Sequence, residues 1–217
     1  MDEFEIPDFS EDDLANDKEI RKSREEAAIY QKMVDDALSI IRNELNVNDS
    51  VPVNLKGFKL FSSRNPTIKK SLKSKSENKE VQVFLAEYHS STSLARYNYK
   101  GDDLYLFGHL TVNEHYPETF ISEERIIDKI FDVFLKLDVD FEKSKRFSHK
   151  FQVFTEDKMK LTKLLQSKDL DPLVAYPEME LEIQKNTIFY RCSRKPISIQ
   201  EAADFCAMTR MLKQIFE

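Results

Sequence analysis

Two short stretches of the sequence hold side chains of the kinds that perform chemistry. The first runs from Phe147 to Asp157 and contains a serine, a histidine and two acids, the residue types of a hydrolytic site. If this stretch is a strand, adjacent side chains point to opposite faces, so Ser148 and His149 cannot form a hydrogen-bonded pair. The two acids suit the first turn of a following helix, where the helix dipole favours negative charge. The pattern therefore predicts a core strand that leads into a helix, without a catalytic role.

The second stretch, GHLTVNEHYPE, contains His109, His115 and Glu118. Along a straight strand the two histidines would lie about 20 Å apart, too far to share a metal ion, although a turn after Val112 would close that gap. The chain also has only three glycines and no glycine-rich phosphate-binding motif. We therefore expect no metal and no cofactor. If the chain has a pocket between sheet and helices, these three residues and His149 are the first candidates to line it.

The two cysteines, Cys192 and Cys206, both fall in segments that have the pattern of core elements. Two cysteines are too few for a disulfide framework, so we expect free, buried thiols in a reducing compartment. The chain shows no signal peptide and no apolar run of the roughly 20 residues that a membrane span needs. These features predict a cytoplasmic protein without a membrane span.

The elements that must position these residues begin with an acidic segment. The first 17 residues carry eight acids and no base, which predicts a disordered tail over residues 1–17. In this tail Phe4 and Phe9 are candidate contacts for a protein partner. Residues 18–46 show apolar steps of three and four residues and predict a long amphipathic helix. Its apolar stripe must be covered by the chain's own sheet or by a second subunit, so a homodimer through this helix is an open alternative.

Residues 51–217 predict one α+β domain with a mostly antiparallel sheet covered by helices. A meander is expected over 81–113, and two strands joined at Lys185 and Asn186 are expected near the end of the chain. Ser198, with Glu201 three residues later, predicts the start of a C-terminal helix. Because residues 81–136 and 178–217 each have the pattern of strands followed by a helix, a repeat with sub-lobes 51–137 and 138–217 is compatible with the sequence.

A lysine- and serine-rich stretch follows the first expected strand and predicts a mobile connection. Lys69, Lys70, Lys73 and Lys75 in this stretch are candidate contacts for a phosphate or for an acidic partner, including the acidic N-terminus. The whole chain nevertheless carries a net charge of −6, which argues against a nucleic-acid partner.

The segment DVDFEKSKRFSHKFQVFTEDK, followed later by TIFYRCSRKPIS, resembles a set of uncharacterised bacterial proteins with a D-I-x-F-E and F-S-x-x-F/Y pattern. Upstream, VFLAEYHSSTSL is similar to their F-x-x-x-Y-x-[ST] strand, so the resemblance covers about residues 55–217. Several of those proteins carry transmembrane helices near the N-terminus, and this chain does not. HYPETFISEE matches their version only with a one-residue slip. The resemblance implies a bacterial origin and a fold but no activity, and its aromatic positions imply packing roles for Phe141, Phe147, Phe151, Phe189 and Tyr190.

Together these observations favour a non-enzymatic interaction or accessory protein whose partner is another protein. One alternative is a small enzyme or ligand-binding protein whose pocket is built around the histidines. A second alternative, a secretion chaperone or an immunity-type inhibitor, rests on the acidic composition alone.

Overall fold

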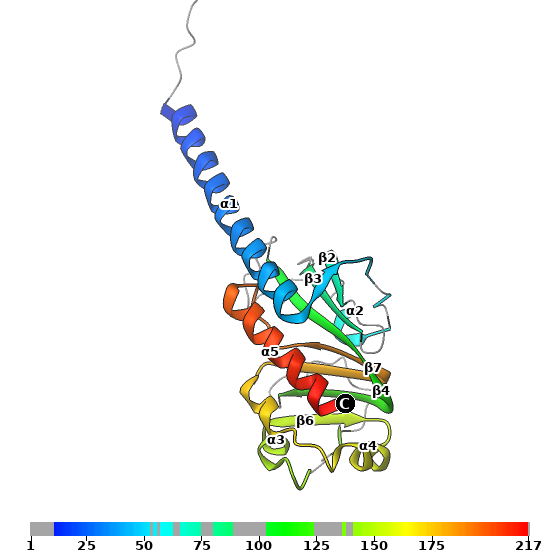
Figure 1. Ribbon diagram of the computed structural model, residues 1–217. Coiled ribbons are helices and arrows are strands. Elements are labelled where there is room, and N and C mark those ends of the chain that lie inside the picture. The colour runs from blue at the N-terminus through cyan, green and yellow to red at the C-terminus, as the bar shows by residue number, and fades with distance from the viewer. Residues whose placement is uncertain are drawn as a thin grey trace, which may run out of the picture.

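The computed structural model describes residues 11–52, 54–55, 57–62, 66–74, 80–88, 103–123, 136–137 and 141–216 (Figure 1). The helices are α1 (Glu11–Leu45), α2 (Lys59–Ser62), α3 (Lys145–Lys150), α4 (Lys158–Leu165) and α5 (Ile199–Phe216), with a 3-10 turn η2 (Asp171–Ala175). The strands are β1 (Val47–Asp49), β2 (Pro66–Ser74), β3 (Val81–Tyr88), β4 (Leu104–Glu123), β5 (Lys136–Leu137), β6 (Phe151–Thr155) and β7 (Glu180–Arg191). The predicted α+β class with an antiparallel sheet and a long N-terminal helix is confirmed.

All these strands belong to one antiparallel sheet. The hydrogen-bonded order is β1-β2-β3-β4-β6-β5, and β7 also pairs with β4. In β4, residues 104–110 pair with β3, whereas residues 119–123 pair with β6. One long strand therefore belongs to both halves of the sheet.

Strand β7 is a hairpin, as the sequence predicts. Its two end residues, Glu180 and Arg191, form an ion pair, whereas a straight strand of this length would hold them more than 30 Å apart at ~3.3 Å per residue. The reversal lies at Lys185, whose φ of 56° falls in the left-handed region used by tight turns. The predicted junction at Lys185 and Asn186 is thus confirmed.

Strand β4 runs around this hairpin. Its residues 108–111 pair with residues 187–190 of one arm, and its residues 119–122 pair with residues 180–183 of the other. Tyr116 pairs with Lys185 at the tip, and the register shifts on both sides of that pair. The β7 hairpin therefore lies in the middle of the sheet, between the two parts of β4 (Figure 1).

Helices α1 and α5 cover one face of the sheet, as Figure 1 shows. The predicted stripe of α1 is confirmed from Val34 to Leu45, and that of α5 is buried along its whole length. On α5 these buried residues are Ala202, Phe205, Cys206, Met208, Thr209, Leu212, Ile215 and Phe216. The predicted helix start is also present, because the Glu201 amide donates a 3.1 Å hydrogen bond to Ser198 Oγ. These contacts make the main hydrophobic core.

A second, aromatic core lies on the opposite face. Phe84, Phe107 and Phe189 project there from three adjacent strands, and the segment that contains Phe58 and Phe61 covers them. The Phe107 and Phe189 rings stack at 5.5 Å. The cover is held by a buried carboxylate, because Glu182 accepts the backbone amides of Lys59 at 3.0 Å and Leu60 at 2.7 Å. Burial nevertheless raises the pKa of Glu182, and these hydrogen bonds oppose that rise.

Four local expectations are wrong. Residues 145–150 form α3, although RFSHKFQVF was expected to be a strand throughout; only Phe151–Thr155 is strand. The meander that was expected to end at residue 113 continues as strand β4 to Glu123, and Ser122 lies buried in it. Pro66–Ser74 forms β2 where a mobile connection was expected. The start of α1 also differs, because the helix begins at Glu11, seven residues before Lys18.

Candidate functional site

The four residues suspected of lining a pocket lie at separate places, three along β4 and one on α3. His109 is on the first part of β4, where its ring makes an edge contact with Phe58 at 6.0 Å. Burial lowers the pKa of His109, so the ring is neutral at physiological pH. His115 and Glu118 are exposed on the stretch of β4 that passes around the β7 hairpin, and His149 is exposed on α3. Among the described residues, no hydrogen bond or ion pair joins these four side chains.

The serine and the acids of the first stretch have structural partners. The Ser148 hydroxyl accepts the Phe141 amide at 3.0 Å and lies 3.1 Å from the Ser144 carbonyl, to which it donates. Asp157 caps α4, because its Oδ1 accepts the Lys160 amide at 2.9 Å, as predicted. Glu156 accepts the Glu118 amide at 3.0 Å. These bonds fix the ends of α3 and α4. None of them places a nucleophile beside a base.

The two cysteines are free and buried, as predicted. Burial raises the pKa of Cys206 to about 11 and raises that of Cys192 still further. Neither thiol is therefore ionised at neutral pH, and an un-ionised thiol is a poor nucleophile. In the part of the chain that the structure describes, no group of three or more His, Cys, Asp or Glu residues could hold a metal ion.

The predicted basic contacts lie on β2, and each one that the structure describes is neutralised by an acid. Lys69 Nζ lies 2.5 Å from Glu87, Lys70 Nζ lies 3.8 Å from Asp49, and Lys73 Nζ lies 2.7 Å from Glu80. Lys75 lies outside the described residues. These lysines therefore join β2 to its neighbouring strands, and little net positive charge remains there for a phosphate.

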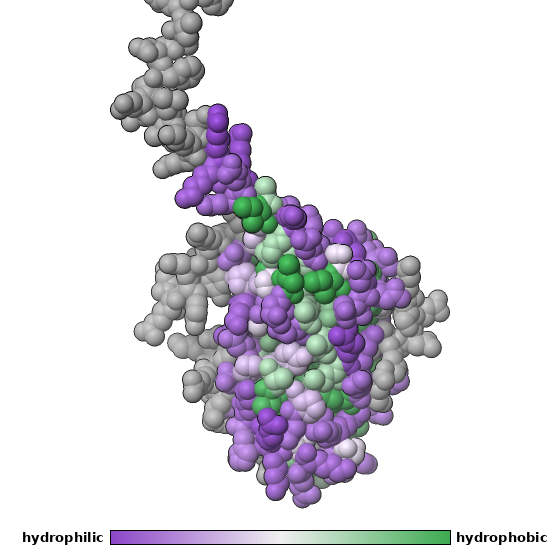
Figure 2. Space-filling view, turned by 60° about the vertical axis from the view of Figure 1, so that its left-hand side comes forward, coloured by the Kyte–Doolittle hydropathy of each residue, from purple (hydrophilic) through white to green (hydrophobic). Residues whose placement is uncertain are grey.

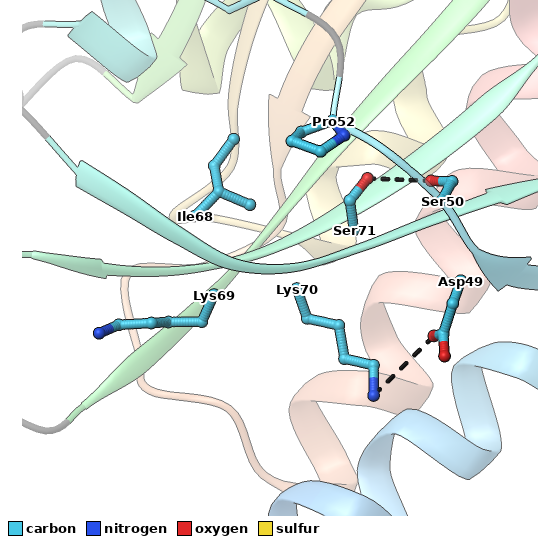
Figure 3. A pocket seen from close by; sticks show the side chains of 7 residues that line it. All are labelled: Asp49, Ser50, Pro52, Ile68, Lys69, Lys70 and Ser71. Atoms are coloured by element: carbon cyan, nitrogen blue, oxygen red, sulfur yellow. Dashed lines mark hydrogen bonds and ion pairs between the residues drawn. The ribbon is translucent and has the colours of Figure 1, made fainter.

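A pocket of about 240 Å³ lies beside two of these lysines (Figure 3). Its lining residues are Asp49, Ser50, Pro52, Ile68, Lys69, Lys70 and Ser71. Figure 3 shows Lys70 directed toward Asp49 and Lys69 directed away from that carboxylate. The Ser50 and Ser71 hydroxyls are hydrogen-bonded to each other at 3.1 Å. The polar groups of this pocket thus have partners within the chain, and no functional site is assigned to it.

Helix α1 has two parts with different surroundings. From Tyr30 onward it packs on the body, and the Tyr30 hydroxyl accepts the Leu104 amide at 3.0 Å. Residues 21–29 are all exposed, including Ile29 at 69%. We call residues 11–29 of α1 the stalk, because this part extends away from the body in Figure 1. Figure 2 shows a hydrophilic surface over the coloured part of the stalk and apolar atoms that begin where the helix meets the body. The candidate contacts Phe4 and Phe9 lie beyond the stalk, outside the described residues.

A second basic region was not recognised in the sequence. Residues 143–168 carry eight Lys and Arg but only two acids, in a chain whose net charge is −6. Six of these cations are exposed. Lys158 interacts within the chain, and the other five are Lys143, Lys145 and Arg146 at α3, and Lys160 and Lys163 on α4. We call these five residues the basic end. None of them forms an ion pair involving the described residues. A count of charges in a sliding window would have found this region.

The comparisons with known proteins identify no relative. Searches against models of protein families, against curated proteins and against solved structures each return no match. The resemblance to uncharacterised bacterial proteins therefore stays a prediction that rests on the aromatic pattern. Of the helices in the described residues, none is both long and apolar enough to cross a membrane.

Proposed function

We propose that this protein is a non-enzymatic interaction protein in which the stalk presents the acidic N-terminal segment to a protein partner. The observation that carries the proposal is the stalk itself. Its 19 residues continue α1 for about 28 Å at 1.5 Å per residue beyond the point where the helix packs on the body. Residues 21–29 of this extension are exposed and so add nothing to either hydrophobic core, and a binding role would explain why the helix is extended.

The side chains of the stalk support an exposed position. Residues 21–26 read RKSREE, and Lys22 lies 4.0 Å from Glu26 in an i,i+4 ion pair. Such pairs stabilise solvated helices by about 0.2–0.5 kcal/mol each. The stalk also propagates a helix that is already nucleated on the body, so it avoids the free-energy cost of starting a new helix. A polar, self-supporting helix is suited to hold a peptide away from the domain surface.

The cytoplasm is the compartment that we propose, because two free cysteines are typical of a reducing environment. An enzymatic role has less support. His109 is on the first part of β4, His115 is on the stretch of β4 around the β7 hairpin, and His149 is on α3. Both thiols have raised pKa values.

The test compares the full chain with a variant that lacks residues 1–10, both tagged at the C-terminus. We expect at least one co-purifying protein to fall tenfold or more in quantitative mass spectrometry when the segment is removed. A matched control keeps the segment but replaces Phe4 and Phe9 by serine, which separates apolar contacts from charge. The same set of proteins at equal amounts with all three chains would contradict the proposal.

A further inference from the structure

We propose that the basic end binds the acidic N-terminal segment, Met1–Ser10, of a second copy of this chain. This inference rests on the proposed function, because it names one partner for the segment that the stalk presents.

The basic end carries charge that the fold leaves uncompensated. Its five cations are exposed, and none forms an ion pair involving the described residues. The lysines of β2, by contrast, each have an acid within 4.0 Å. Lys160 and Lys163 lie three residues apart on α4, and like charges at this spacing raise the free energy of the folded chain through mutual repulsion. An anionic ligand at the basic end would relieve that repulsion.

The N-terminal segment has the complementary chemistry. Residues 1–10 contain four acids and no base, with Phe4, Ile6 and Phe9 placed between the acids. The basic end also offers an apolar side chain, because Met159 is 85% exposed on α4 beside Lys160. Methionine is flexible and makes favourable contacts with aromatic rings. An acidic peptide with interspersed phenylalanines therefore matches both the charge and the apolar contact of this surface.

The segment of the same chain cannot supply this contact. Tyr30 meets the body at Leu104, and Glu11 lies about 28 Å farther along the helix axis. From the first part of β4 to β6, four strand spacings of about 4.8 Å add roughly 19 Å. Figure 1 shows α1 and the pair α3 and α4 at opposite ends of the molecule. Ten residues span at most about 35 Å when fully extended, so the partner segment must come from another molecule.

This geometry implies an open, head-to-tail contact between copies. The acidic segment and the basic end are different surfaces, so each copy can give one contact and receive another. Contacts of this kind produce rings when the rotation closes and chains when it does not. Assembly should therefore increase with concentration and decrease with salt, since the contact is largely electrostatic.

Two other polyanions are less well matched. Nucleic acid and anionic membranes would both approach a chain of net charge −6 that carries an acidic segment on a long stalk. They also lack the phenylalanine side chains that would contact Met159. These polyanions serve as competing outcomes in the test.

The direct test measures fluorescence anisotropy of a labelled peptide, MDEFEIPDFSEDD, titrated with protein that lacks residues 1–10. We expect saturable binding at low salt that weakens at least tenfold between 50 and 300 mM NaCl. The variant K160E/K163E should weaken binding about tenfold or more, since two contacts change from attractive to repulsive. The variant K32E/K195E has the same change in net charge at exposed positions outside the basic end, and we expect its affinity to stay within twofold.

A reciprocal charge exchange makes the test specific. A peptide with Glu3→Lys and Glu5→Lys should regain affinity for the K160E/K163E protein. In sedimentation velocity, the full chain should form larger species, and removal of residues 1–10 should abolish them. Circular dichroism of each variant confirms that the fold is intact.

Three results would overturn the inference: no saturable binding at 1 mM protein and low salt, equal binding by K160E/K163E and K32E/K195E, or binding of 30% phosphatidylserine vesicles or single-stranded RNA without binding of the peptide. The proposed function would survive each of them if a different protein still depends on residues 1–10 for co-purification. Conversely, self-association without any other partner would support this inference and limit the proposed function to assembly.

Discussion

The lysines of β2 and the cations of the basic end are chemically alike, yet the fold uses them differently. On β2, the side chains of Lys69, Lys70 and Lys73 are all at least partly exposed, and each reaches an acid on or next to a neighbouring strand. At the basic end the cations lie on two short helices and on the turn before α3, and the described residues give them no acidic partner. The first group connects strands, and the second is available to a ligand. A run of basic residues therefore indicates a binding surface only when the fold leaves its charge uncompensated.

The largest loss of stability is expected when the buried ion pair of Arg191 is broken. This guanidinium is 1% exposed and pairs with Glu180, which also receives Arg194. Arg191→Met should destabilise the fold by about 3–5 kcal/mol, because Glu180 would keep a buried charge without its main partner. Urea denaturation measures the loss. Adding Glu180→Leu should restore most of the stability, since the buried charge is then removed as well. A double variant as unstable as the single one would contradict this account.

The second prediction distinguishes the basic end from the lysines of β2. K160E/K163E should leave the free energy of unfolding within about 0.5 kcal/mol of the original, because surface changes without buried partners are usually neutral. The same variant should reduce assembly of the full chain by about tenfold in sedimentation velocity. The proposed difference between the basic end and the lysines of β2 would be wrong if K160E/K163E unfolded the domain or left assembly unchanged.

A substitution on β2 should have a smaller effect of the opposite kind, because it should lower stability and leave peptide binding unchanged. Lys69→Glu loses its ion pair with Glu87, a 13% exposed side chain, and places two like charges together. We expect a loss of about 1 kcal/mol in stability, given the 0.2–1 kcal/mol that part-exposed pairs contribute. Affinity for the acidic peptide should not change. Lys69→Met serves as the control, because it removes the ion pair without adding repulsion. Its stability should lie between that of the original chain and that of Lys69→Glu.

The smallest effect is a pH dependence at Asp49. The hydrogen bond from Arg42, with the charges of Lys70 and Arg42, holds the pKa of this carboxyl below its usual value. A lowered pKa in the folded state means that the stabilisation is present above the unfolded-state pKa and is lost as pH falls through the folded-state pKa. Between pH 5 and pH 3 the parent chain should therefore lose slightly more stability than Asp49→Asn. Thermal melting across this range measures the difference, and parallel curves would show that Asp49 contributes nothing.

Much of the fold follows from patterns that have a single interpretation. The turn at Lys185 and Asn186, the Ser198 cap and the apolar stripes of α1 and α5 were all predicted correctly. Local sequence dictates each of these features, so no knowledge of distant contacts was needed.

The errors arose where one pattern permits two structures. Phe147 and Phe151 are four residues apart, a spacing that places side chains on one side of either a helix or a strand. Contacts remote in sequence decide the matter, because the Phe147 amide donates to Asp171 and the Ser148 hydroxyl accepts the Phe141 amide. On β2, lysines and a proline are typical of loops but also of edge strands, where they discourage pairing with other chains.

The site was harder to predict than the fold. Whether a lysine is free depends on the acid that the folded sheet places beside it, and Glu87 lies 18 residues from Lys69 in the sequence. A charge count alone identifies the excess between residues 143 and 168. It does not show that β2 is neutralised, and that finding required the strand register.

The position of β7 between the two parts of β4 affects how the chain folds during its synthesis. Residues 104–123 leave the ribosome well before residues 180–191. Both parts of β4 are therefore made before the strand that pairs with them. Until then each part has an open inner edge, and such edges are sites of wrong pairing between nascent chains. The sheet can close only after the β7 hairpin, Glu180–Arg191, has been made. Chains truncated before residue 180 should therefore aggregate instead of folding.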